Sequence, residues 1–456
     1  MNAAKPASGH PDNAPLAAPA AVSFGEAFRF WLRLGFISFG GPAGQIAIMH
    51  TELVERRRWI SEKRFLHALN YCMLLPGPEA QQLATYIGWL MHRTWGGIVA
   101  GALFVLPSLF ILIALSWIYV RFGDVPVVAG IFHGIKPAVT ALVLHAAHRI
   151  GGRALKNGWM WSIAAAAFVA IFAFDVPFPV IIGAAALIGY LGSHLAPTVF
   201  SPGGGHEATQ ARLGPALIDD DTPTPAHARF SRGHLARLLV TGLGIWLAAM
   251  GVLVVAFGLD GALTRMAWFF SKAALLTFGG AYAVLPYVYQ GAVEQHQWLT
   301  APQMIDGLAL GETTPGPLIM VVAFVGFVGG WGAEVLGPQA PFLGGVLAAT
   351  IVTFFTFLPS FVFILAGGPL VEATHGRLGF TAPLSAVTAA VVGVILNLAL
   401  FFGWHVLWPQ GFNGRFDVLS AVIAGAAVVA LFRYRIGVIP LLGACAALGL
   451  VVTLLR

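Results

Sequence analysis

The chain has 456 residues, 58% of them hydrophobic and only 10% charged, with a mean hydropathy of +0.82 and a net charge of +6. So apolar a composition excludes a soluble globular protein and indicates a polytopic protein whose solvent is the lipid bilayer. The basic residues cluster between apolar segments, as in cytoplasmic loops, so no nucleic-acid partner is expected. The sequence has no P-loop, CxxC, HExxH or GxSxG motif, so we expect no enzyme, no cofactor and no metal site.

Thirteen apolar segments are divided by a polar stretch in the middle of the chain. Residues 1–23 are rich in alanine and proline and are expected to form a disordered cytoplasmic tail, and residues 24–196 the first membrane repeat. The SPGGGH and DDDTPTP stretches predict a flexible linker at 197–234, followed by an extra connecting helix at 235–258 and a second membrane repeat at 259–456. The apolar segments lie at about 24–50, 65–91, 97–120, 125–148, 159–175, 178–196, 235–258, 265–290, 303–331, 341–367, 382–404, 416–432 and 437–455.

The second half repeats the first at a shift of 239 residues. This shift places Phe39-Gly40-Gly41 on Phe278-Gly279-Gly280 and Pro76-Gly77-Pro78 on Pro315-Gly316-Pro317 without a gap. A shared register of Gly and Pro over about 40 residues indicates an internal duplication. Because one unmatched helix separates the copies, the second copy begins on the opposite side of the membrane, and the two should be inverted. Inverted repeats are the common plan of secondary transporters, which bind their substrates near the midplane.

Two membrane topologies fit this pattern. Either all 13 segments span, or the first two segments of each copy are re-entrant hairpins that enter and leave on one side. The hairpin version places far more Lys and Arg in the cytoplasm, and arms of about 13 residues rise only ~20 Å, too short to span alone. Both versions put the N-terminus in the cytoplasm and the C-terminus in the periplasm. The predicted fold is an all-α polytopic membrane protein with two inverted-topology repeats, broken or re-entrant helices and 9 to 13 membrane segments.

The helix breaks form the candidate substrate-binding site. Pro-Gly-Pro frees backbone carbonyls, Gly-Gly gives access to the backbone, and the half-helix N-termini that follow attract anions. A single break is more often a packing kink, but breaks at repeat-related positions favour the transporter pattern. The substrate-binding candidates at the breaks are Gly40, Gly41, Gln45, Pro76, Gly77, Pro78, Gly279, Gly280, Thr313, Thr314, Pro315, Gly316 and Pro317.

Four charged residues lie close to these breaks in the sequence. Arg33 and Lys272 each precede a Phe-Gly-Gly by six residues, so they are repeat equivalents, and we expect both to bind substrate facing the pseudo-symmetry axis. Glu79 and Glu312 are not equivalent under the shift, which suits a role in coupling or gating. Two alternatives stay open: the cations bind an anion directly, or they pair with the two carboxylates.

Four motifs resemble those of the chromate ion transporter family in its long, two-domain form: FGGPAGQIA, LPGPEAQQLATYIG, FGGAYAVLPYV and GETTPGPL. The resemblance covers the chain from about Phe24 to Leu455 apart from the linker. It implies secondary active export of chromate across a bacterial inner membrane, conferring chromate resistance, with sulfate as a competing oxyanion and protons as a candidate coupling ion. It directs functional interest to Arg33, Gly40, Gly41, Pro76, Pro78, Glu79, Gly279, Gly280 and Glu312.

Several alternatives to chromate export remain at this level. The two half-sites need not be equal, since Pro42 of the first copy corresponds to Ala281 of the second. Chromate and sulfate are both tetrahedral oxyanions, and a cationic site with half-helix N-termini would attract either. A sulfate transporter or a passive anion channel could therefore use the same scaffold, as a monomer or a homodimer. A membrane enzyme would need a catalytic constellation that the sequence does not show.

Overall fold

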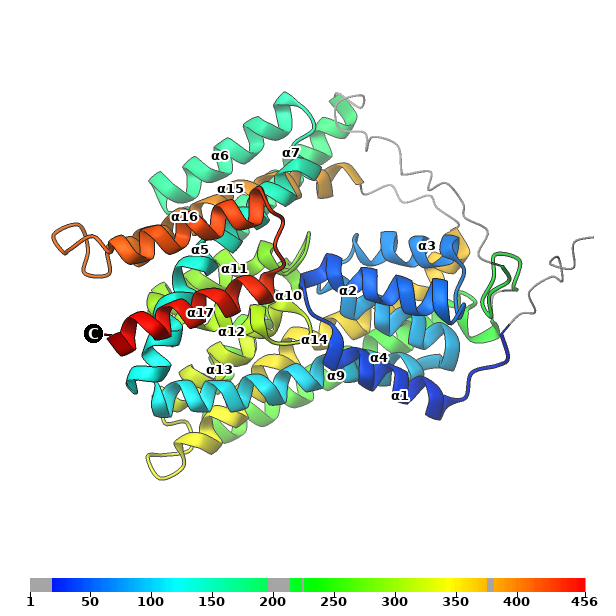
Figure 1. Cartoon of the computed structure of the whole chain (residues 1–456). Helices are drawn as coiled ribbons and strands as arrows, with labels where there is room; N and C mark the ends of the chain where they lie inside the picture. Colours follow the sequence, from blue (N-terminus) through cyan, green and yellow to red (C-terminus); the bar gives the residue numbers. More distant parts are fainter. Residues whose placement is uncertain (1–18, 196–213, 224, 375–380, 456) are drawn as a thin grey trace, which may run out of the picture.

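A computed structural model describes residues 19–195, 214–223, 225–374 and 381–455, and its regular structure is helical in these ranges (Figure 1). The polytopic all-α fold is confirmed. The first half consists of α1 (Phe24–Ile37), α2 (Gly41–His50), the π-helix η1 (Thr51–Arg56), α3 (Glu62–Cys72), α4 (Glu79–Phe122), α5 (Pro126–Ala154), α6 (Gly158–Phe174) and α7 (Phe178–Leu195).

The second half follows a short 3-10 helix, η2 (Ala226–Ala228), and the connecting helix α9 (Arg232–Phe257), and it presents the same order of elements, except that η4, α13 and α14 replace α4, which is itself kinked at His92 and Arg93. Even the π-helical turn recurs, as η3. The elements are α10 (Ala262–Leu276), α11 (Ala281–Tyr289), η3 (Gln290–Gln295), α12 (Ala301–Thr313), the 3-10 helix η4 (Leu318–Met320), α13 (Val321–Gly332), α14 (Pro341–Thr374), α15 (Thr381–Leu407), α16 (Val418–Phe432) and α17 (Val438–Leu455).

Helix length separates membrane-crossing helices from hairpin arms. Seven helices of the described chain are long and apolar enough to cross a membrane: α4, α5, α7, α9, α14, α15 and α17. The hairpin arms α1, α3, α10 and α12 have only 14, 11, 15 and 13 residues. At a rise of 1.5 Å per residue the longest of them reaches ~23 Å, less than the ~30 Å hydrocarbon core. The lengths therefore favour broken hairpins over thirteen full spans.

The helices are sorted into two groups that each contain parts of both copies (Figure 1). In one group α15 packs against α5, α6 and α7, while α16 and α17 pack against α5. In the other, α14 packs against α4, α10 and α13, and α1 packs against α4. Helices α11 and α12 connect the groups through α15 and α5. The hairpins thus lie where the two copies meet.

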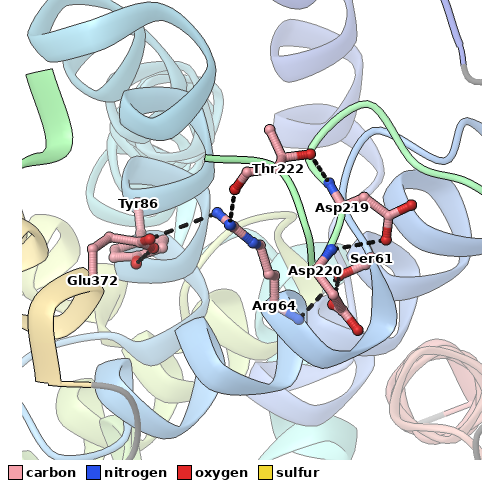
Figure 2. A network of polar contacts seen from close by, with 7 residues as sticks. All are labelled: Ser61, Arg64, Tyr86, Asp219, Asp220, Thr222 and Glu372. Carbon is pink, nitrogen blue, oxygen red and sulfur yellow. Dashed lines mark hydrogen bonds and ion pairs between the residues drawn. The ribbon is translucent and has the colours of Figure 1, made fainter. Parts of the chain in front are cut away.

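Part of the predicted flexible linker is bound to the first hairpin. The amides of Leu217 and Ile218 donate to the carbonyls of Arg58 and Trp59 at 2.9 and 3.1 Å, and the Ser61 amide donates back to Ile218 at 3.0 Å. Figure 2 shows side chains extending the contact, with the Ser61 hydroxyl donating to Asp220 at 2.6 Å. Residues 214–223 are therefore docked along the hairpin loop. The rest of the predicted linker up to residue 213, and most of the predicted N-terminal tail, lie outside the described residues.

Candidate substrate site at the crossed helix breaks

The two copies meet through a reciprocal pair of backbone hydrogen bonds. The Gly77 amide donates to the Thr277 carbonyl at 2.7 Å, and the Gly316 amide donates to the Ser38 carbonyl at 2.8 Å. Gly77 and Gly316 are repeat equivalents, and so are Ser38 and Thr277. Each Pro-Gly-Pro break is therefore crossed with the Phe-Gly-Gly break of the other copy. The sequence places the breaks correctly, but it does not show which break meets which.

Glycine is required at the crossing for its backbone conformation and for space. The φ angles of Gly77 and Gly316 are +134° and +102°, in the region that side chains disfavour. A β-carbon at Gly77 would clash with the Ser360 hydroxyl, and one at Gly316 would lie 2.8 Å from the Ser108 β-carbon. Ser108 and Ser360 are themselves repeat equivalents, from the Leu-Pro-Ser of each copy. These two serines belong to the site, and their shared tripeptide is the signal that could have identified them.

Buried polar atoms without protein partners surround the crossing. Within the described chain, no hydrogen bond reaches the hydroxyls of Ser108 and Ser360 or the amide oxygens of Gln45, Gln81 and Gln82. A buried polar group left unpaired costs about 1–3 kcal/mol, so such atoms normally bind water or a ligand. The crossing is thus a polar site in an apolar molecule.

Gln45 ties the first copy to the second. Its side-chain nitrogen donates to the Gly316 carbonyl at 2.5 Å and to the Ser38 carbonyl at 3.4 Å, so it bridges both sides of one crossing. The repeat-equivalent position holds Val284, which cannot form this bridge. The two crossings are therefore chemically unequal.

Three helix N-termini at the crossing have no side-chain cap. The first turns of α2, α4 and α11 follow Gly40, Pro78 and Gly280, none of which offers a capping side chain. Apart from Pro42, which has no amide hydrogen, and Ala283, which donates to the Gly280 carbonyl, the leading amides lack a side-chain acceptor, and the helix dipoles make the region attractive to anions. Thr313 and Thr314, predicted as donors to substrate, instead direct their hydroxyls to carbonyls of their own turn, Leu310 at 3.0 Å and Gly311 at 3.1 Å.

The two carboxylates both lie near the second copy's Gly-Gly break. Glu79, the first residue of α4, is half-buried, and its Oε1 atom would lie 3.9 Å from a β-carbon at Gly280. Glu312 is buried at the end of α12 and accepts a hydrogen bond from the hydroxyl of Tyr282, two residues beyond Gly280. Although they are not repeat equivalents, both carboxylates are thus brought to the same break.

The cations beside these carboxylates are not the predicted ones. Arg33 and Lys272 are both exposed, and Lys272 lies over the half-exposed Trp268 ring at 5.8 Å. No ion pair joins either cation to Glu79 or Glu312 in the part of the chain that the structure describes. Both residues lie off the buried stripe of their helices, because that stripe is set by packing against α4 and α14. The expectation that they face the axis is corrected, and a role for them in substrate binding stays a prediction.

Two arginines near the end of α5, Arg149 and Arg153, act electrostatically on these carboxylates. Arg153 has the larger effect on Glu79 and Arg149 the smaller one, while Arg149 also acts on Glu312. The sequence does not indicate Arg149, because the predicted apolar segment ends near residue 148, whereas α5 continues to Ala154 and carries Arg149 on its last turns. Its counterpart in the aligned Ala-Val-Thr-Ala register is Asn397, so this cation is present in one copy only.

Comparison with known proteins identifies relatives over most of the chain. A family model described as "Chromate transporter" matches residues 25–190 and 264–450. A chromate transport protein of Pseudomonas aeruginosa is 34% identical over 382 residues, covering 83% of this chain and 81% of the relative. A chromate transport protein of Cupriavidus metallidurans is 28% identical over 430 residues, covering 92% and 91%.

A shorter relative matches only part of the chain. The uncharacterized transporter YwrA of Bacillus subtilis is 32% identical over 137 residues, which are 30% of this chain but 77% of the relative. No solved structure matches. The two matched ranges of the family model leave out the linker and α9, which lie between the two copies.

Proposed function

The chain belongs to the chromate transporter family, and on this premise we propose that it exports chromate across the bacterial inner membrane, with the crossed breaks as its binding site. The reciprocal hydrogen bonds between the copies carry this proposal. They hold two half-sites against each other at the point where broken helices of inverted repeats bind substrates in secondary transporters.

The chemistry of the crossing suits a tetrahedral dianion. Uncapped N-termini of α2, α4 and α11 supply backbone donors, and the hydroxyls of Ser108 and Ser360 can donate from opposite sides. Arg149 supplies a planar guanidinium, which recognises oxyanions through paired hydrogen bonds. In this proposal chromate takes the place of Glu79 at the cationic end of the site, so that the carboxylate must move when the anion binds.

Orientation follows from the positive-inside rule. With the N-terminus in the cytoplasm, the loop from Arg56 to Arg64 and the end of α5 with Arg149 and Arg153 lie on the cytoplasmic side. A cationic entrance there would gather chromate from the cytoplasm, consistent with export. Energy would come from the membrane potential or from protons. In this proposal Glu79 and Glu312 couple it to transport by exchanging their ionic and hydrogen-bond partners.

Uptake of chromate by inside-out membrane vesicles tests the proposal. Wild-type vesicles should accumulate chromate only with an imposed gradient, and Arg149→Gln should lower the initial rate at least about tenfold because one charge-assisted contact is worth about 1.5–3 kcal/mol. Lys156→Gln, which removes an exposed charge just beyond α5, is the matched control and should transport normally. Excess sulfate reports whether the site distinguishes the two oxyanions.

Two results would contradict the proposal. Uptake that persists at full rate without any gradient would indicate a passive channel. A loss of transport in Arg33→Gln and Lys272→Gln, with Arg149→Gln unaffected, would move the site to the exposed cations and away from the crossing.

A further inference from the structure

A large cavity lies well away from the crossed breaks. It has a volume of about 890 Å³ and is bounded by the end of α4, the first half of α5, the start of α12 and the end of α13. Tyr119 in its wall is eleven residues beyond Ser108 on α4, a rise of ~16 Å, and Lys136 is thirteen residues before Arg149 on α5, or ~20 Å. Two continuous helices therefore connect the cavity to the proposed binding site.

The cavity contains an ion pair that is only partly satisfied. Asp306 of α12 is 2% exposed, and its Oδ2 atom lies 3.2 Å from Lys136 Nζ and accepts the Tyr119 hydroxyl at 2.8 Å. Its Oδ1 atom is buried without a hydrogen-bond partner among the described residues. Lys136 remains 30% exposed and lines the cavity. The lysine thus faces open space, while its counter-ion is an internal carboxylate.

We propose that this cavity is a second site for a tetrahedral oxyanion, in which Lys136 exchanges Asp306 for the anion when Asp306 takes up a proton. The inference rests on the proposed function and adds a subsite to it. When Asp306 is ionised, its negative charge neutralises Lys136 and repels an incoming dianion. When Asp306 is protonated, it keeps its contact with Tyr119, Lys136 becomes free, and the anion replaces the lost charge at its ammonium group.

The other titratable groups around Asp306 do not reproduce this exchange. His133, one turn before Lys136 on α5, lines the same cavity but lies 3.6 Å from the carboxylate of Asp417. Asp124, in the turn after α4, also lines the cavity and is negative. Helix α13 contributes only apolar residues and glycine to the wall. Lys136 is thus the cavity-lining cation whose counter-ion is buried. When Lys136 leaves Asp306 for the anion, the proton that Asp306 takes up neutralises the carboxylate in its place.

Sulfate binding to purified protein in lipid nanodiscs tests the exchange. Sulfate keeps its charge over the neutral and mildly acidic range, so any pH dependence belongs to the protein. Wild-type protein should bind sulfate at this site at least about tenfold more tightly in mildly acidic than in neutral buffer. Asp306→Asn fixes a neutral side chain and should bind tightly at both pH values. Lys136→Met should lose this binding, Lys136→Arg should retain it, and Lys156→Met is the matched control for an exposed lysine.

The outcomes separate this inference from the proposed function. Wild-type affinity in Lys136→Met, or unchanged pH dependence in Asp306→Asn, would overturn the second site even if vesicles transport chromate normally through Arg149. If the wild type transports no chromate but shows the predicted sulfate binding, the proposed function fails and the oxyanion site stands. A normal melting temperature of Lys136→Arg and Asp306→Asn verifies that the fold is intact.

Discussion

Two partly buried ion pairs lie at comparable places in the two copies, but their surroundings differ. Arg64 of α3 pairs with Glu372 near the end of α14 at 3.6 Å, and Asp306 of α12 pairs with Lys136 beside Tyr119, near the end of α4. Since α12 is the counterpart of α3 and α14 that of α4, each cluster joins a hairpin arm of one copy to a spanning helix of the other. The two copies thus use the same architecture with different surroundings for the ion pair.

The first cluster is closed, and the second is open. Arg64 also donates to the Thr222 carbonyl of the docked linker at 2.5 Å, and Glu372 accepts the Tyr86 hydroxyl at 2.5 Å (Figure 2). Asp306 and Lys136 instead face the cavity of about 890 Å³. The linker thus covers the first cluster, whereas the second borders open space, and this asymmetry is what the proposed secondary transport would require of a single state of an alternating-access cycle.

Neutralising the acid of each pair should give the largest contrast. Glu372→Gln leaves Arg64, 16% exposed, without its counter-ion and should cost about 3 kcal/mol of unfolding free energy. Asp306→Asn should cost less than about 1 kcal/mol, because Lys136 can be hydrated in the cavity. Denaturant unfolding of both variants in one detergent measures the difference, and equal losses would contradict the distinction between closed and open clusters.

Removing one hydroxyl from each cluster should give a smaller contrast. Tyr86→Phe deletes a hydrogen bond to a carboxylate from a side chain that is 1% exposed, and we expect a loss of about 2 kcal/mol. Tyr119→Phe deletes the matching bond to Asp306, but water in the cavity can replace the hydroxyl, so the loss should be about 1 kcal/mol. The same unfolding assay applies, and a larger loss for Tyr119→Phe would reverse the assignment.

The docked linker should show the smallest effect. Asp220→Ala removes the exposed bond from the Ser61 hydroxyl but leaves Ser61 in place as the cap of α3, and it should weaken docking by about 0.5 kcal/mol, which accelerates amide exchange at Leu217 and Ile218 about twofold. Ser231→Ala is the control, since the Ser231 side chain does not cap α9. Unchanged exchange in Asp220→Ala would show that backbone contacts alone hold the linker.

Local sequence rules predicted the positions of the helix breaks well. They did not predict which charged residues lie at the breaks, because this depends on tertiary packing. Gly40, Gly77, Gly279 and Gly316 all adopt positive φ angles at the predicted breaks, because Gly and Pro constrain the backbone wherever they occur. The facing of Arg33 depended on which stripe of α1 packs against α4, which no local pattern fixes. Arg149 was missed for a related reason: a charged helix end and a loop have the same composition.

The crossed backbone hydrogen bonds also bear on how such a molecule could have arisen. Each copy supplies the carbonyl that the other copy's glycine needs, so one copy alone would leave its Gly77 or Gly316 amide unpaired. A chain with a single copy would complete the crossing only beside a second chain inserted upside down. Joining both copies through α9 fixes their opposed orientation and their one-to-one ratio. Within one chain the two copies can also diverge in sequence. Glu312 thus stands where the first copy has Met73, and Arg149 where the second has Asn397.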